Sequence, residues 1–247
     1  MVEFVQDLLR VDAAAARFAT LYLCAIVVLL AASAVYARVV PGRPEPRAEG
    51  ARARRAGKDV LGGFIHWLAS RRITPNQVTW IGLGLVLFNC AYFLHHRDTF
   101  LFGTGLIVAF LFDSLDGAVA RAQGSSSKFG AYLDAVIDRY QEIATYLAIG
   151  LVTEMWLAAF LVITGSMLTS YNKARAAIEI PVDNKGWPDL LGKGVRVFCL
   201  CCALIGDGVL PWLLPATLYA LAVMTHFTAA QRIIRGYLLI RQAEDAS

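Results

Sequence analysis

The sequence predicts an all-α integral membrane protein with a six-helix transmembrane core, an interfacial amphipathic helix and one extra N-terminal transmembrane helix. Of its 247 residues, 57% are hydrophobic and only 17% are charged. The apolar residues gather in runs that reach the ~20 residues needed to span a bilayer. The net charge of +4 comes from basic residues beside these runs, where the positive-inside rule accounts for them. We therefore expect a polytopic membrane protein that has no nucleic-acid partner.

The N-terminal part of the chain contains three predicted segments. Residues 18–40 are apolar throughout and long enough to cross a bilayer. Residues 41–58, rich in Pro, Gly and Arg, follow as a flexible basic linker. Residues 59–71 mix apolar side chains with a few charged ones at helical spacing, which indicates an amphipathic helix at the membrane interface.

The remaining apolar runs predict the six core helices. Thr74 is placed to cap the first of them, with Pro75 at its first helical position. The second and third helices are separated by a short polar loop, and the fourth and fifth by a longer one at residues 180–194. The helices are expected at about residues 77–94, 99–123, 129–153, 155–178, 195–205 and 210–239.

Charge bias along the chain predicts its orientation in the membrane. Basic segments alternate with weakly charged turns, and the positive-inside rule places the basic set in the cytoplasm. The C-terminus is then cytoplasmic, and an active site near the basic ends of the helices faces the cytoplasm. The basic segments are residues 43–58, 71–72, 121–128, 173–196 and 232–241.

Acidic and small residues recur at helical spacing in the second and third core helices. Five positions at i, i+3, i+4, i+7 and i+8 share one helix face: Asp113, Asp116, Gly117, Ala120 and Arg121. Three positions that step by four share a face of the next helix: Gly130, Asp134 and Asp138. If the two faces oppose each other, four carboxylates converge, and they repel unless cations neutralise them. All-oxygen ligands suit Mg²⁺ or Mn²⁺, and two such ions can clamp phosphate oxygens during a displacement.

This pattern of eight residues and all its spacings resembles the signature of the CDP-alcohol phosphotransferases, which are integral-membrane enzymes of phospholipid head-group synthesis. The resemblance covers roughly residues 56–240. We therefore expect two parts: residues 1–55, with the N-terminal transmembrane helix and basic linker, and residues 56–247, the CDP-alcohol phosphotransferase membrane domain.

The resemblance implies a role for each signature residue. Asp113, Asp116 and Asp134 are expected to bind metal, and Asp138 is expected to be the general base and to touch a metal as well. Asp113 and Asp116 also belong to the expected nucleotide site. Its other members are Gly117, Ala120, Arg121 and Gly130. Without the aspartates, the two glycines and the alanine would indicate only close helix packing.

The resemblance also implies the substrates. The donor is expected to be CDP-diacylglycerol or a related CDP-linked molecule, CMP is the leaving group, and the acceptor is an alcohol. A segment that begins at Ser170 is similar to family members that use inositol phosphate or glycerol phosphate, and a phosphate-bearing acceptor needs a cationic pocket. The candidate pocket residues are Lys173, Arg175, Lys193 and Arg196.

Several alternatives stay open at this point. The four basic residues are also typical of topology signals or snorkelling side chains. The acceptor is expected to be inositol phosphate, but glycerol 3-phosphate, serine, inositol and choline are alternatives. Remote alternatives for the aspartates are an intramembrane prenyltransferase and a transporter. By analogy with the family, we expect a homodimer surrounded by membrane lipid.

Overall fold

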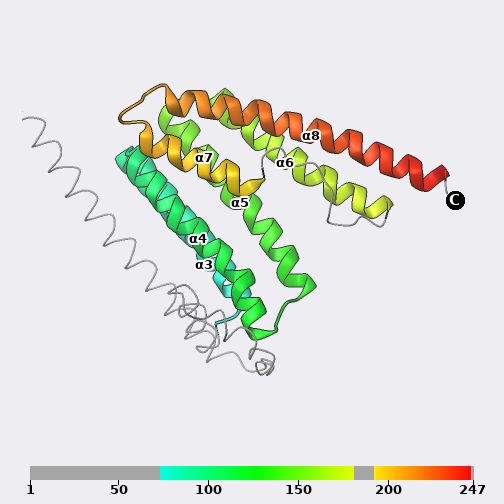
Figure 1. Cartoon of the computed structure of the whole chain (residues 1–247). Coiled ribbons are helices and arrows are strands. Elements are labelled where there is room, and N and C mark those ends of the chain that lie inside the picture. Colours follow the sequence, from blue (N-terminus) through cyan, green and yellow to red (C-terminus); the bar gives the residue numbers. More distant parts are fainter. Residues whose placement is uncertain (1–72, 181–191, 246–247) are drawn as a thin grey trace, which may run out of the picture. The chain divides into compact units, whose positions relative to one another are not determined.

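The computed structural model describes residues 73–180 and 192–245 (Figure 1). The predicted N-terminal transmembrane helix at 18–40, the linker at 41–58 and the interfacial helix at 59–71 lie outside the described residues, as does most of the loop at 180–194. Within the described residues every regular element is an α-helix, in agreement with the predicted all-α class.

Six helices follow one another in the described part of the chain, and each has a counterpart among the predicted core helices. The last helix continues to Asp245 rather than ending near residue 239. The helices are α3 (Pro75–His96), α4 (Thr99–Gln123), α5 (Lys128–Thr153), α6 (Trp156–Glu179), α7 (Lys193–Gly206) and α8 (Leu213–Asp245).

Three of these helices, α3, α4 and α8, are long and apolar enough to cross a membrane. Helix α5 has 26 residues, a sufficient length, but its first half carries charged residues of the signature face. The charged residues of the signature therefore weaken the apolar signal in the first half of α5.

The position of Pro75 at the start of α3 confirms that part of the prediction, and a side-chain contact to Thr74 comes from Gln77. Pro75 is the first residue of α3, and the side-chain Oε1 of Gln77 accepts hydrogen bonds from the backbone N–H of Thr74 at 2.9 Å and from its hydroxyl at 3.1 Å. A Gln three residues after a capping Thr is the arrangement of a capping box. It defines where α3 begins, four residues before the first side chain that contacts a signature aspartate.

The chain divides into two compact units, each formed by parts of several helices. Among the described residues, the first unit contains 73–89 and 105–141, hence most of α3, most of α4 and the first half of α5. Within it, the side-chain amide of Gln123 donates to the carbonyl of Ile73 at 2.7 Å. This bond ties the end of α4 to the segment that precedes α3.

The second unit contains residues 90–104 and 142–245, in which α6 and α8 run side by side in the same direction (Figure 1). A Cβ added to Gly165 would lie 2.8 Å from the Cβ of Thr225, so the two helices approach closely there. The hydroxyl of Thr169 donates to the carbonyl of Thr225 at 3.2 Å, and the guanidinium of Arg232 donates to the carbonyl of Thr169 at 2.7 Å. Arg232, which the sequence placed in a basic topology segment, is buried and also joins the helices.

Candidate active site

Three carboxylates come together in the first unit. Asp113 on α4 and Asp134 and Asp138 on α5 each offer one oxygen, and these oxygens lie within 4.8 Å of one another. All three side chains are half-buried. Asp134 and Asp138 are one helical turn apart, so both project from the face of α5 that meets Asp113. The predicted convergence of the two signature faces therefore holds for these three residues.

The donor set of this cluster fits a hard divalent cation. Like charges at this separation repel strongly when they are partly shielded from water. A divalent cation removes that repulsion, and carboxylate oxygens are the ligands that Mg²⁺ and Mn²⁺ prefer.

Asp116, the fourth predicted ligand, lies outside this group of three. Its side chain is buried, with 8% of its surface exposed. One carboxylate oxygen, Oδ2, accepts a hydrogen bond from the hydroxyl of Thr79 on α3 at 2.6 Å, and the other accepts from the backbone N–H of Gly117. A metal role for Asp116 stays a prediction.

Three contacts at the signature aspartates involve residues outside the site predicted from the sequence. They are Thr79 at Asp116, Gln141 at Asp113 and Arg139 at Asp138. Gln141 follows Asp138 by three residues and Asp134 by seven, so helical spacing alone could have placed it on the acidic face of α5. Arg139 has a nitrogen 3.8 Å from the Asp138 carboxylate, which is at the outer range of an ion pair.

The small residues of the expected nucleotide site lie on the two helices that carry the aspartates. A Cβ added to Gly117 would lie 3.3 Å from Nη1 of Arg121, which is exposed one turn further along α4. Ala120, which directly precedes Arg121 in the sequence, is half-buried. A Cβ on Gly130 would lie 3.3 Å from the side-chain oxygen of Asn76. Gly130 thus permits close approach of the start of α3, and its predicted nucleotide role remains open.

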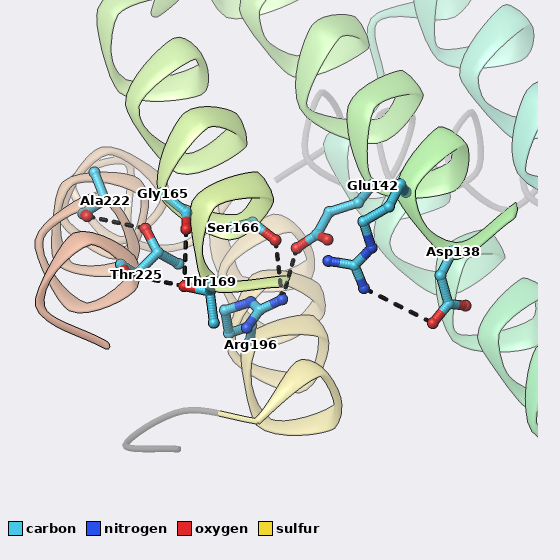
Figure 2. A network of polar contacts seen from close by, with 9 residues as sticks. Asp138, Glu142, Gly165, Ser166, Thr169, Arg196, Ala222 and Thr225 are labelled. Atoms are coloured by element: carbon cyan, nitrogen blue, oxygen red, sulfur yellow. Dashed lines mark hydrogen bonds and ion pairs between the residues drawn. The ribbon is translucent and has the colours of Figure 1, made fainter. Parts of the chain in front are cut away.

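The four candidate acceptor residues, all in the second unit, have different environments. Arg196 is buried, and its Nη2 donates to Glu142 at 2.8 Å and to Ser166 at 3.1 Å (Figure 2). Arg175 forms an exposed ion pair with Glu179 at 2.6 Å. Lys173 and Lys193 are half-buried.

Arg196 therefore has a structural partner in addition to its predicted role. Its ion pair with Glu142 joins α7 to α5, and its bond to Ser166 joins α7 to α6. A guanidinium carries five N–H donors. Both of these bonds use the same nitrogen, Nη2.

An α-helical chain with helices long and apolar enough to cross a membrane, and with a carboxylate cluster suited to a divalent cation, is typical of membrane enzymes that act on phosphate-containing substrates. Residues 72–234 match the family model described as CDP-alcohol phosphatidyltransferase. The chain belongs to this family. It is a transferase and an integral membrane protein.

Two named relatives are similar to this chain over most of their own length. An archaetidylinositol phosphate synthase of Pyrococcus horikoshii is 34% identical over 169 residues, which are 67% of this chain and 85% of the relative. A phosphatidylinositol phosphate synthase of Corynebacterium glutamicum is 29% identical over 204 residues, which are 75% of this chain and 87% of the relative.

Solved structures share the fold. A phosphatidylinositol phosphate synthase of Mycobacterium tuberculosis with CDP-DAG bound has a TM-score of 0.65 at 24% identity, covering 72% of this chain and 94% of that one. The same enzyme in complex with manganese and citrate has a TM-score of 0.66 at 23% identity, covering 72% and 89%.

Proposed function

We propose that the protein transfers a phosphatidyl group from CDP-diacylglycerol to inositol phosphate and releases CMP. The observation that carries this proposal is the convergence of Asp113, Asp134 and Asp138 inside the region that matches the family. The relatives from Pyrococcus horikoshii and Corynebacterium glutamicum are both named for lipid products that contain inositol phosphate. This agreement favours inositol phosphate over glycerol 3-phosphate and over free serine, inositol or choline.

We further propose that the site binds two divalent cations, Mg²⁺ or Mn²⁺. Their ligands are the four signature aspartates, Asp113, Asp116, Asp134 and Asp138. Such a cation, when bound, offsets the charge of the donor's phosphate oxygens and makes phosphorus a better electrophile. Asp138 accepts the proton of the attacking acceptor hydroxyl, because a carboxylate beside the reacting oxygen can act as a general base. This role is supported by the membership of Asp138 in the carboxylate cluster, with a nitrogen of Arg139 3.8 Å from its carboxylate.

The nucleotide end of the donor is assigned to the signature face of α4. Arg121 is exposed there and would offset the charge of the diphosphate. Gly117 and Ala120 keep the adjoining surface free of bulky side chains, and Gly130 does so at the start of α5. Asp113 and Asp116 complete the proposed site.

For the acceptor phosphate we propose Lys173, Arg175, Lys193 and Arg196. Cations at the ends of two successive helices suit a phosphate-bearing alcohol. Arg196 is the strongest member of the set, because Glu142 and Ser166 hold its guanidinium in one orientation.

We also propose that all six described helices form the transmembrane core, with the helix at 18–40 as an addition to it and the domain boundary near residue 55. The alternation of basic and weakly charged segments supports an active site that faces the cytoplasm and a cytoplasmic C-terminus. A homodimer is proposed by family analogy alone.

The acceptor assignment predicts a single preferred substrate. Purified protein with CDP-diacylglycerol and Mg²⁺ is offered inositol phosphate, glycerol 3-phosphate, inositol, serine or choline, and CMP release is measured. We expect CMP release with inositol phosphate to exceed that with inositol, serine or choline by about 100-fold, because these acceptors leave the cations of the site without a phosphate partner. Release with inositol phosphate should also exceed that with glycerol 3-phosphate. Faster release with glycerol 3-phosphate or a free alcohol would overturn the acceptor assignment while leaving the family reaction in place.

A further inference from the structure

Two uncharged side chains outside the signature each donate a hydrogen bond to a signature aspartate. Thr79 lies on α3, a helix that contributes none of the eight signature residues, and its hydroxyl contacts Asp116. Gln141 lies on α5, and its side-chain amide contacts Asp113 at 3.1 Å. Both side chains are almost fully buried, with 2% and 0% of their surfaces exposed.

The Thr79 contact is directed at the carboxylate rather than at the helix backbone. Its Oγ1 lies 2.6 Å from Oδ2 of Asp116 and 3.2 Å from the carbonyl of Pro75 one turn earlier. A hydroxyl has a single proton to donate. The shorter contact, to a charged acceptor, is the stronger one and takes that proton. A buried helical Thr would otherwise satisfy itself on the backbone carbonyl alone.

The Gln141 contact fixes the other α4 carboxylate. Its Nε2 donates to Oδ1 of Asp113, and a carboxylate has about four lone-pair sites. The bond therefore restricts the orientation of Asp113 and occupies one of these sites. A Cβ added to Gly82 would lie 3.4 Å from this Nε2 and 3.7 Å from the Cα of Asp113. The small residue on α3 leaves room for the amide between the helices.

We propose that Thr79 and Gln141 are positioning residues, which hold Asp116 and Asp113 in the orientations that bind the divalent cation. This inference rests on the proposed function, because it takes the signature aspartates as metal ligands. Removal of a side chain that hydrogen-bonds to a metal ligand and orients it typically weakens metal affinity by about 10- to 100-fold. Helix α3 then acts on the metal site without providing a ligand to it.

The test is a Mn²⁺ titration of the full-length, EDTA-stripped protein in lipid nanodiscs, with free Mn²⁺ followed by its electron paramagnetic resonance signal. Thr79→Val and Thr79→Ala remove the hydroxyl, and Gln141→Met removes the amide at nearly constant volume. We expect each to weaken Mn²⁺ binding by about 10-fold, while Thr79→Ser, which keeps the hydroxyl, stays within about 2-fold of the wild type.

Two control variants remove similar bonds away from the aspartates. Thr228 is buried and donates only to a backbone carbonyl at 2.8 Å among its described hydrogen bonds, so Thr228→Val matches the Thr79 change. Gln123→Met removes a glutamine bond that ends on the Ile73 carbonyl. Both controls should bind Mn²⁺ as the wild type does, and the melting temperature of each metal-free protein reports its folding.

The outcomes separate this inference from the function on which it rests. Unchanged Mn²⁺ affinity in the folded Thr79 and Gln141 variants would overturn the positioning role, and so would equal weakening in the two controls. Loss of folding in all three test variants would show a structural role and overturn it as well. Absence of Mn²⁺ binding by the wild type would overturn the proposed function itself.

Discussion

Asp138→Asn should abolish phosphatidyl transfer while leaving donor binding in place. An amide cannot accept the proton of the attacking hydroxyl, and loss of a general base typically reduces turnover by about 10²- to 10⁴-fold. Asp113 and Asp134 remain in this variant, so part of the carboxylate cluster stays. We expect kcat to fall by at least about 100-fold, with a small change in the affinity for CDP-diacylglycerol measured by equilibrium binding.

Asp98→Asn is the matched control. Asp98 accepts a hydrogen bond from the backbone N–H of Leu101 at 2.9 Å at the start of α4, and Asn caps helices equally well. This variant should transfer at the wild-type rate. Retained turnover in Asp138→Asn would show that Asp138 is not the general base. Complete loss of donor binding would show that Asp138 acts mainly as a metal ligand in the donor site.

Glu142→Leu should produce the largest loss of stability among single substitutions at the described polar contacts. It leaves the buried Arg196 without the carboxylate 2.8 Å away, and only 5% of Arg196 is exposed. Breaking a buried ion pair from one side costs about 3–5 kcal/mol. We expect a marked decrease in the melting temperature, in nanodiscs, and in the fraction of protein that resists proteolysis.

The double variant Glu142→Leu/Arg196→Met separates the two roles of Arg196. Replacing a buried ion pair with apolar side chains of similar volume is often neutral for stability, so the melting temperature should return close to that of the wild type. The KM for inositol phosphate should still rise by about 10-fold or more, the effect of about 1.4 kcal/mol, with the KM for CDP-diacylglycerol unchanged. A stable double variant with normal acceptor KM would exclude Arg196 from the acceptor site.

Much of the fold was predictable, because apolar runs and caps are local properties of the sequence. Thr74 and Pro75 marked the start of α3, and the capping contacts of Gln77 confirm it. The convergence of Asp113, Asp134 and Asp138 was predictable for a similar reason. Helical spacing determines which residues share a face, and clustered acids in an apolar setting have few arrangements that avoid severe repulsion.

The remaining site contacts depend on how helices pack, which spacing does not determine. Thr79 is an ordinary helical threonine until α3 is placed against α4, where its hydroxyl meets Asp116. Glu142 follows Asp138 by four residues, so helical spacing places it on the same face of α5, but its partner Arg196 is 54 residues away on another helix. Contacts from uncharged donors and ion pairs between distant residues could therefore be identified only in the structure.

The most direct measurement of the central claim is CMP release by the purified protein from CDP-diacylglycerol and inositol phosphate, before and after EDTA and again after Mg²⁺ is restored. We expect release to stop with EDTA and to return with Mg²⁺, and Asp134→Asn to show almost none under any condition. Release that continues in EDTA, or an Asp134→Asn variant as active as the wild type, would contradict a metal-dependent transferase built on these carboxylates.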